Sequence, residues 1–432
     1  MSLFHPISVR YKWWVVAMLW GVCFFNYADR LAIFSVFPVL QTEFGFSKAE
    51  LGLIGSAFMW VYAGMAPAAG YIGDRLRRKT LILGGFFFWS IVTMSTGWAS
   101  KFYQFFGIRA LEGLGEAFYF PASMSVISDY HARSTRSRAM SLHQSSVYIG
   151  TIAGGALGGF FAEHFNWRTG FYVFGLAGML LALFLSRFLR EPFRGQTELE
   201  SIPSMTPPEG PSVKMALREI FRTPTAVVLM LVFIGANFVA MTFLTWMPTF
   251  LGEKFGLKLT MAGLAGTLFI QLASAVGAPV GGLLADRLAR WHPGGRMMVQ
   301  AAGLIAGAAF VLSIGMTRAV PTLILAMTIF GFCKGLYDSN IFASLYDVVH
   351  PRARATAVGL MNAAGWLGGA LAPATIGWVV TRGGTANEVD NLSRAIAIGS
   401  AIYLAGAFLL LPSILLFARR DVVRAWARPG KA

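Results

Sequence analysis

The chain has 432 residues, of which 56% are hydrophobic and only 13% are charged, and its formal net charge is +16. Soluble domains carry about a quarter charged residues, so this composition excludes an ordinary soluble protein and indicates a chain that crosses a membrane repeatedly. In a soluble protein so much positive charge would suggest nucleic acid. Here the basic residues lie between apolar runs, where they fix membrane topology, so no nucleic-acid partner is expected.

Apolar stretches long enough to cross a bilayer recur from one end of the chain to the other. The first follows Arg10 and Lys12 and has no small-residue cleavage site after it, so we expect it to be retained as a membrane span. The pattern predicts an all-α membrane protein with twelve transmembrane helices. The predicted spans are 13–38, 51–72, 80–98, 103–128, 139–162, 169–189, 225–250, 261–285, 297–317, 321–346, 355–381 and 395–418.

A segment rich in proline, serine and charge separates the sixth span from the seventh. We therefore predict an N-terminal six-helix bundle at 1–190, a cytoplasmic linker at 191–224, and a C-terminal six-helix bundle with a cytoplasmic tail at 225–432. The halves repeat, because "GYIGDRLRRK" after the second span returns as "GGLLADRLAR" after the eighth. Two similar halves around a linker are typical of secondary transporters, whose substrate site lies near the bilayer midplane.

Loop charges alternate from one span to the next. Lysine and arginine favour one side by about three to one, so both termini are expected in the cytoplasm. Short loops and the absence of a targeting segment favour a bacterial cytoplasmic membrane, with the chain as a multi-pass protein and a monomer.

The two copies of the cytoplasmic repeat resemble the signature of the major facilitator superfamily. The matching residues are Gly70, Asp74, Arg75, Arg78 and Lys79 in the first copy and Gly282, Asp286, Arg287 and Arg290 in the second. Arg77 departs from the pattern, because the motif usually has glycine there. The resemblance implies the major facilitator fold, with two pseudo-symmetric six-helix bundles.

Shorter strings resemble the anion:cation symporters within that superfamily. They are "NYADR" in the first span, "SAFMWVYAG" in the second, "GLGEAFYFPAS" in the fourth, "NWR" before the sixth and "TWMPTFL" at the end of the seventh. This resemblance implies proton-coupled symport of a small organic anion, such as an aldonate, a hexuronate or another carboxylate. Spinster-like lipid transporters are also similar at Asp29, Arg30, Arg109 and Glu116, so a lysolipid transporter is one alternative. A membrane sensor that binds a ligand without moving it is another.

Asp29 and Arg30 stand side by side within the first span, where each charge costs about 2.5–3.5 kcal/mol on insertion scales. Adjacent helical residues point about 100° apart, so each needs a partner elsewhere. Arg109, Glu112 and Glu116 share one face of the fourth span and supply candidates. We interpret Asp29 and Glu116 as proton carriers, and Arg30 and Arg109 as ligand and partner of the anion's carboxylate. The alternative is a static ion-pair cluster that joins the two spans.

Other candidate substrate contacts are less specific. Lys334 occupies the place of Glu116 in the repeat, and it either pairs with Asp338 one turn on or provides a second cation for a dicarboxylate. Gln144 and Asn362 suit a hydroxylated substrate, or serve only as interhelical hydrogen bonds. Tyr27 and Trp246 complete the set of polar and aromatic candidates.

The roles of one glutamate and one histidine remain open. Glu112 is either a third titrating group or a polar residue at a helix interface. His143, beside Gln144, either packs or protonates near neutral pH.

Charges near the cytoplasmic ends of the spans form a separate set. They are Asp74, Arg75, Asp129, Asp286, Arg287 and Asp347. Because aspartate adds little to topology, we expect these residues to latch the cytoplasmic side while the transporter faces outward. The alternative is that the arginines are topology signals only.

The remaining motif searches point away from catalysis. Cys23 and Cys333 lie in apolar runs without disulfide or metal spacing. The glycine-rich strings "GLGEAF" and "GTIAGGALGG" follow no strand, so they favour helix packing over a nucleotide site. We expect no enzyme, no metal and no cofactor, with protons as the coupling ion and a small organic anion as the substrate.

Overall fold

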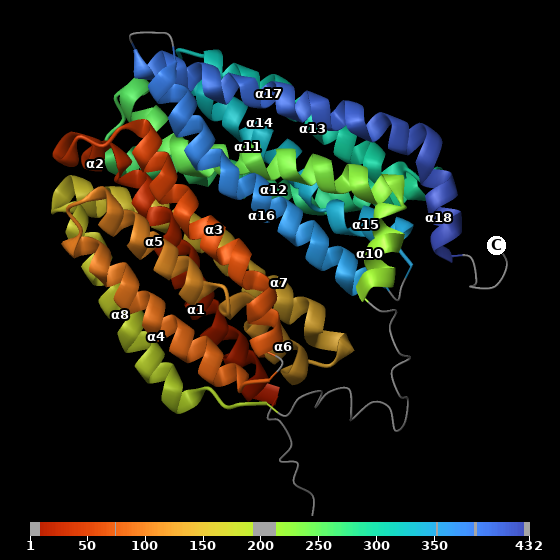
Figure 1. Cartoon of the computed structure of the whole chain (residues 1–432), viewed down its shortest axis with the longest axis horizontal. Coiled ribbons are helices and arrows are strands. Elements are labelled where there is room, and N and C mark those ends of the chain that lie inside the picture. Colours follow the sequence, from red (N-terminus) through yellow and green to blue (C-terminus); the bar gives the residue numbers. More distant parts are fainter. Residues whose placement is uncertain (1–8, 74, 193–212, 351–352, 384–386, 427–432) are drawn as a thin grey trace, which may run out of the picture. The chain divides into compact units, whose positions relative to one another are not determined.

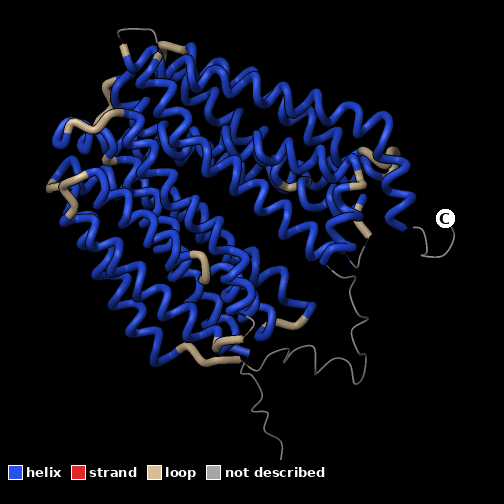
Figure 2. The backbone as a smooth tube through the Cα atoms, in the orientation of Figure 1, coloured by secondary structure: helices blue, strands red, loops and turns tan. Residues whose placement is uncertain are grey.

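The computed structural model describes residues 9–73, 75–192, 213–350, 353–383 and 387–426. Within these ranges the backbone is helical apart from short turns and contains no strand (Figure 2). The all-α prediction is therefore confirmed. The chain forms two compact units, Met1–Phe46 with Leu53–Pro207 and Lys258–Leu264, and Ser47–Gly52 with Pro208–Leu257 and Ala265–Ala432.

Both units are bundles of long helices (Figure 1). The first contains α1 (Val9–Ser35), α2 (Phe37–Phe44), most of α3 (Lys48–Gly73), α4 (Arg78–Ser95), α5 (Phe102–Glu116), α6 (Tyr119–Tyr130), α7 (Arg133–His164) and α8 (Trp167–Phe188). The second contains α10 (Val213–Phe221), α11 (Pro224–Phe255), most of α12 (Leu259–Ala289), α13 (Gly295–Met316), α14 (Val320–Asp338), α15 (Ile341–Val348), α16 (Arg354–Arg382), α17 (Glu388–Pro412) and α18 (Ala418–Trp426).

Ten helical segments of the described residues are long and apolar enough to cross a membrane. Helix α3, with 26 residues, and the pair α5–α6 account for the other two predicted spans. The α5–α6 pass is less apolar because it carries Arg109, Glu112 and Glu116. The predicted linker at 191–224 includes α10, while residues 193–212 lie outside the described part of the chain.

The two units use the same helix pairings. In the first unit α1 packs on α7, and α4 packs on α5 and α8. In the second, α11 packs on α16, and α13 packs on α14 and α17. The paired helices of the second unit follow one another along the chain in the same order as those of the first. This is the pseudo-symmetry that the sequence repeat predicts.

Glycines bring the paired helices into backbone contact. Gly150, Gly154 and Gly158 recur every fourth residue on the face of α7 that meets α1. A Cβ added to Gly154 would lie 2.4 Å from the carbonyl oxygen of Ala28. On α16, a Cβ on Gly368 would lie 2.0 Å from the carbonyl oxygen of Ile234. Lipid tails are as apolar as the helices, so such close packing rather than hydrophobic burial holds these pairs together.

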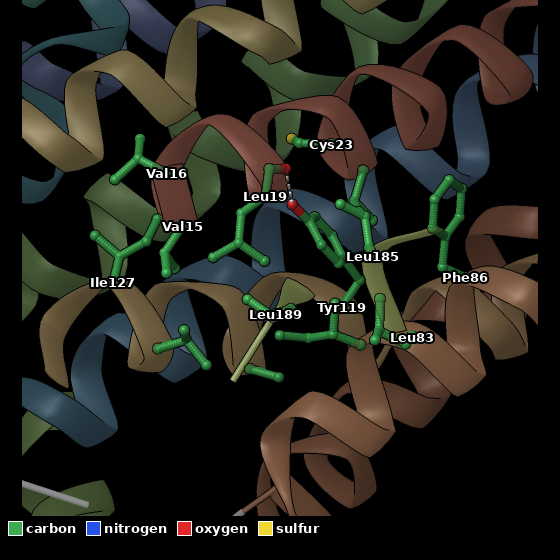
Figure 3. Packing of buried hydrophobic residues seen from close by; sticks show 14 of the residues in the cluster. Val15, Val16, Leu19, Cys23, Leu83, Phe86, Tyr119, Ile127, Leu185 and Leu189 are labelled. Atoms are coloured by element: carbon green, nitrogen blue, oxygen red, sulfur yellow. Dashed lines mark hydrogen bonds between the residues drawn. The ribbon is translucent and has the colours of Figure 1, made fainter. Parts of the chain in front are cut away.

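A buried apolar cluster fills one end of the first unit (Figure 3). Val15 and Leu19 of α1 meet Phe86 of α4 and Leu185 of α8 there. Tyr119 of α6 lies among them, and its hydroxyl donates a hydrogen bond of 2.7 Å to the carbonyl oxygen of Leu19. A buried tyrosine needs such a partner, so this bond fixes the start of α6 against α1.

We predict that Gly154→Leu separates α1 from α7 and lowers the free energy of unfolding by about 1–3 kcal/mol or more, because overpacked cores cannot absorb an added side chain. Unfolding of the purified protein in detergent micelles measures this. Gly107→Leu is the matched control, since a Cβ at Gly107 meets nothing within 4 Å. Equal stability of the two variants would contradict the backbone contact.

Candidate functional site

Five charged side chains gather inside the first unit. Asp29 and Arg30 come from α1, and Arg109, Glu112 and Glu116 come from α5. All five are buried, with exposed fractions between 0% and 5%. Gly113 of α5 permits this gathering, because a Cβ there would lie 2.3 Å from the carbonyl oxygen of Phe58 on α3.

Arg30 pairs with Glu116. Its Nε and Nη2 atoms donate hydrogen bonds to Glu116 Oε2 over 3.1 and 2.5 Å. Nη2 also donates to Asn26 Oδ1 over 3.1 Å, one turn earlier on α1. The guanidinium carbon lies 4.5 Å from the ring centre of Phe58 and 4.7 Å from that of Tyr27. Aromatic faces attract cations, so these rings orient Arg30 without neutralising it.

Arg109 pairs with Glu112 one turn further along α5, through Nη1 and Oε2. Its Nη2 atom donates to the carbonyl oxygen of Arg30 over 3.3 Å, which connects the two ion pairs. The other oxygen of Glu112 accepts a hydrogen bond of 3.2 Å from Thr93 on α4. Three helices therefore converge on this pair.

Asp29 is the carboxylate without an ionic partner. Neither of its oxygens accepts a hydrogen bond from any described residue, although the side chain is fully buried. Its electrostatic neighbours include Glu112, Glu116 and Arg109, with the Trp89 indole beside them. Two arginines thus face three carboxylates, which leaves one excess negative charge if all five groups are ionised. Among the described residues, no group of three or more His, Cys, Asp or Glu side chains could hold a metal ion.

The helix carrying the cluster is broken beside it. Helix α5 ends at Glu116 and α6 begins at Tyr119. Pro121 lacks the N–H that would bond to the carbonyl of Ala117, which explains the turn. The second unit has a break in the corresponding place, between Asp338 and Ile341. Broken helices of this kind border the binding sites of many transporters.

The other predicted binding residues are divided between the two units. Gln144 is exposed on α7 of the first unit, and Tyr27 lies on α1 against Arg30. Lys334, Trp246 and Asn362 belong to the second unit. Lys334 forms an ion pair with Asp338, which is the local pairing that the sequence left open. Trp246 is fully buried, and Asn362 is exposed.

His143 packs beside Tyr119. Its Nε2 atom lies 2.8 Å from the Tyr119 hydroxyl, and its side chain is fully buried. Because the Tyr119 proton already goes to Leu19, Nε2 is the donor in this contact, while Nδ1 has no hydrogen-bond partner among the described residues. This arrangement favours the packing role over a protonated one.

The charges predicted to form a latch near the helix ends pair within each unit. Arg78 at the start of α4 pairs with Asp129 at the end of α6. In the second unit Arg296, near the start of α13, binds both Asp286 over 2.8 Å and Asp347 over 3.0 Å. Arg75 and Arg287 are exposed, and Asp74 lies outside the described residues. The prediction from the sequence did not include Arg296 among these residues. Arg296 lies near the start of α13, and Arg78 lies at the start of α4, the helix with the equivalent pairings in the first unit.

Several residues that contact the charged cluster were not predicted from the sequence. Asn26 lies four residues before Arg30, a spacing that places both on one face of α1. Phe58 and Tyr62 are four residues apart on α3 and both present rings to Arg30. Thr93 gives no signal in the sequence, because only the packing of α4 on α5 brings it to Glu112.

The sequence of this chain matches the profile of a known protein family. The sequence profile of the Major Facilitator Superfamily matches residues 19–373 and, in a second match, residues 251–432. The chain belongs to the Major Facilitator Superfamily. It is a transporter and not an enzyme, as predicted, and it spans the membrane several times.

The relatives of this chain include anion transporters and spinster proteins. The chain is 28% identical to probable anion transporter 4, chloroplastic, of Oryza sativa subsp. japonica, over 86% of its own length and 64% of that relative. It is 27% identical to the probable galactarate/D-glucarate transporter GudP of Bacillus subtilis, over 90% of both chains. It is also 31% identical to human protein spinster homolog 1, over 79% of this chain and 68% of that one. The chain thus spans under two thirds of the first of these relatives.

A solved structure shows the same fold. The crystal structure of a bacterial homologue of the human lysosomal transporter Spinster superposes with a TM-score of 0.80, covering 98% of this chain and 100% of that one at 23% identity. The major facilitator fold predicted from the sequence is confirmed.

We predict that Arg30→Gln and Glu116→Gln each lower the free energy of unfolding by about 3–5 kcal/mol, because each leaves a buried charge unpaired. The double variant should lose less than the sum, since it removes both charges. The exposed pair Arg168 and Glu43 is the matched control, with an expected coupling of about 0–1 kcal/mol. Additive losses at Arg30 and Glu116 in micelles would show that the pair is not coupled.

Proposed function

We propose that the protein carries a small organic anion across the membrane by proton-coupled symport and alternating access. The observation that carries this proposal is the excess carboxylate in the buried cluster of Asp29, Arg30, Arg109, Glu112 and Glu116. An ionised carboxylate without a partner is very costly in a dry site. A proton on Asp29 balances the cluster, so the site has a built-in place for the coupling ion.

Exchange of carboxylates at Arg30 then couples the proton to the anion. Glu116 occupies the Nε and Nη2 donors of Arg30. When Glu116 takes a proton, it no longer neutralises the guanidinium, whose planar fork suits a substrate carboxylate. Tyr27 and Phe58 hold the guanidinium in place during this exchange. One internal carboxylate is thereby replaced by an external one.

Arg109 has the supporting role in this scheme. Its bonds to Glu112 and to the Arg30 carbonyl fix the backbone that carries Arg30. Glu112 is ion-paired and bonded to Thr93, which favours a positioning residue over a third proton carrier. Asp29 and Glu116 remain the proposed proton carriers.

The relatives support an anion as the substrate. One is named as an anion transporter and another as a probable galactarate/D-glucarate transporter. We propose a sugar acid or another small carboxylate, with Gln144, Trp246, Lys334 and Asn362 as further contacts. A lipid substrate is the second candidate, because a spinster protein is 31% identical to this chain.

Topology and gating follow from the loop charges. We place both termini in the cytoplasm and the protein, as a monomer, in a bacterial cytoplasmic membrane. The latch that the sequence predicts at Asp74, Arg75, Asp129, Asp286, Arg287 and Asp347 stays part of this proposal. The ion pairs of Arg78 and Arg296 favour it, because they fix Asp129, Asp286 and Asp347 at the helix ends.

Uptake into proteoliposomes tests the proposal, with a panel of aldonates, hexuronates, aldarates and monocarboxylates. We predict that one class accumulates only under an inward proton gradient. Asp29→Asn and Glu116→Gln should each abolish that accumulation and leave counterflow exchange, because they remove the proton site without removing the arginines. Asp390→Asn, the same chemical change at an exposed position of α17, is the control and should transport normally.

Three results would contradict symport. Uptake that ignores the gradient shows that protons are not coupled. Binding without accumulation indicates a sensor. Movement of fluorescent lysolipid in place of any acid favours the spinster-like alternative.

A further inference from the structure

An apolar cavity lies in the first unit between α3, α4 and the α5–α6 pass. Its volume is about 410 Å³. It is lined by Ile72 of α3, by Thr80, Gly84 and Phe88 of α4, and by Leu114 and Phe118 of the α5–α6 pass. Gly84 is among the lining residues, and a Cβ added there would meet nothing within 4 Å. A side chain added at Gly84 would therefore enter open space beside α4.

The surroundings of the groove favour hydrocarbon as its filling. Phe87, Phe88 and Ile91 on the same part of α4 are 36–41% exposed. Exposed apolar side chains on a membrane-spanning helix face lipid. From Thr80 to Phe88 the groove follows α4 for about 12 Å, since each helical residue rises about 1.5 Å. One leaflet of hydrocarbon is about 15 Å deep, so the groove is long enough for the part of one acyl chain that lies nearest the headgroup.

Positive charge lies at one end of the groove. Thr80 and Leu81 line its mouth, and the Leu81 N–H donates a 3.1 Å hydrogen bond to the carbonyl oxygen of Arg77. Arg77 is therefore one helical turn from the mouth, and its side chain is exposed. Arg75 is exposed beside it, and Leu76 between them is 53% exposed.

The other cations of this loop are engaged elsewhere. Arg78 pairs with Asp129, and the Lys79 ammonium donates to the carbonyl oxygen of Ser186 over 2.7 Å. Glu191 accepts the backbone N–H groups of Arg78 and Lys79, so it already caps the start of α4. Arg77 makes no ion pair or side-chain hydrogen bond within the described part of the chain. It is the cation that is free to meet a ligand at the mouth.

We propose that this groove and Arg77 form a binding site for one anionic phospholipid. One acyl chain lies in the groove over Gly84, and the headgroup phosphate meets Arg77 at the mouth, with Leu76 in the adjoining hydrocarbon. The site recognises both parts of the molecule, since the groove selects a chain and the arginine selects negative charge. Arg77 stands where related sequences usually carry glycine, so this chain has a charge at the mouth that the motif by itself does not supply.

Native mass spectrometry of the delipidated full-length protein in detergent tests the site. The probes are dioleoyl phosphatidylglycerol, dioleoyl phosphatidylcholine and inorganic phosphate. We predict that phosphatidylglycerol binds more tightly than phosphatidylcholine. Arg77→Gln should lower this preference about fivefold, which is the contribution of one arginine near the membrane surface to the binding of anionic lipid. Gly84→Leu should lower the occupancy of phosphatidylglycerol about tenfold, because the new side chain fills the groove. Inorganic phosphate should not compete, since it has no chain.

Gly107→Leu controls for the glycine replacement. Gly107 lies seven residues before Leu114 on α5, and a Cβ there also meets nothing within 4 Å. It should keep wild-type lipid binding. Equal binding of the two phospholipids, or wild-type occupancy in Gly84→Leu, would overturn the site. If Gly84→Leu does not fold, Arg77→Gln decides alone, because an exposed loop residue can be changed without loss of the fold; an unchanged preference there also overturns the proposal.

Discussion

The free-energy cost of burying charge in a low-dielectric interior determines how the helices of the first unit pack. The bond between Arg30 and Glu116 is the interaction on which the rest depends, because it joins α1 to α5 and neutralises one charge from each. Once it is made, Arg109 needs Glu112 in its own helix, and Asp29 is left beside both pairs. The aromatic rings of Phe58 and Tyr62 then bring α3 against the same guanidinium. Three further features of the bundle are therefore linked to this one ion pair.

Much of this was predictable from the sequence because the bilayer restricts the choices. The span pattern, the repeat and the meeting of Asp29, Arg30, Arg109 and Glu116 all follow from apolar length and the cost of buried charge. The pairing was not predictable. Glu112 and Glu116 both lie on the face of Arg109, and the sequence does not say which carboxylate a flexible arginine will take. Arg296 was missed for a similar reason, since a basic residue at a helix start also reads as a topology signal.

Glycine has opposite uses in the two parts of this unit. On α7, Gly154 leaves no room for any side chain, and the helices touch through their backbones. On α4, Gly84 faces open space and lines the apolar groove. The sequence alone does not separate these uses, because both glycines stand in apolar helices. Only the position of the neighbouring helix decides between a contact and a cavity.

The two ion pairs differ in when they can form during synthesis. Arg109 and Glu112 are three residues apart, so α5 can leave the ribosome with that charge already balanced. Arg30 is separated from Glu116 by 86 residues. In the bilayer without α5, helix α1 would carry Asp29 and Arg30 without their partners on that helix, at roughly 5–7 kcal/mol on insertion scales. The arrival of α5 is thus the step of insertion that relieves the cost of the charge on α1.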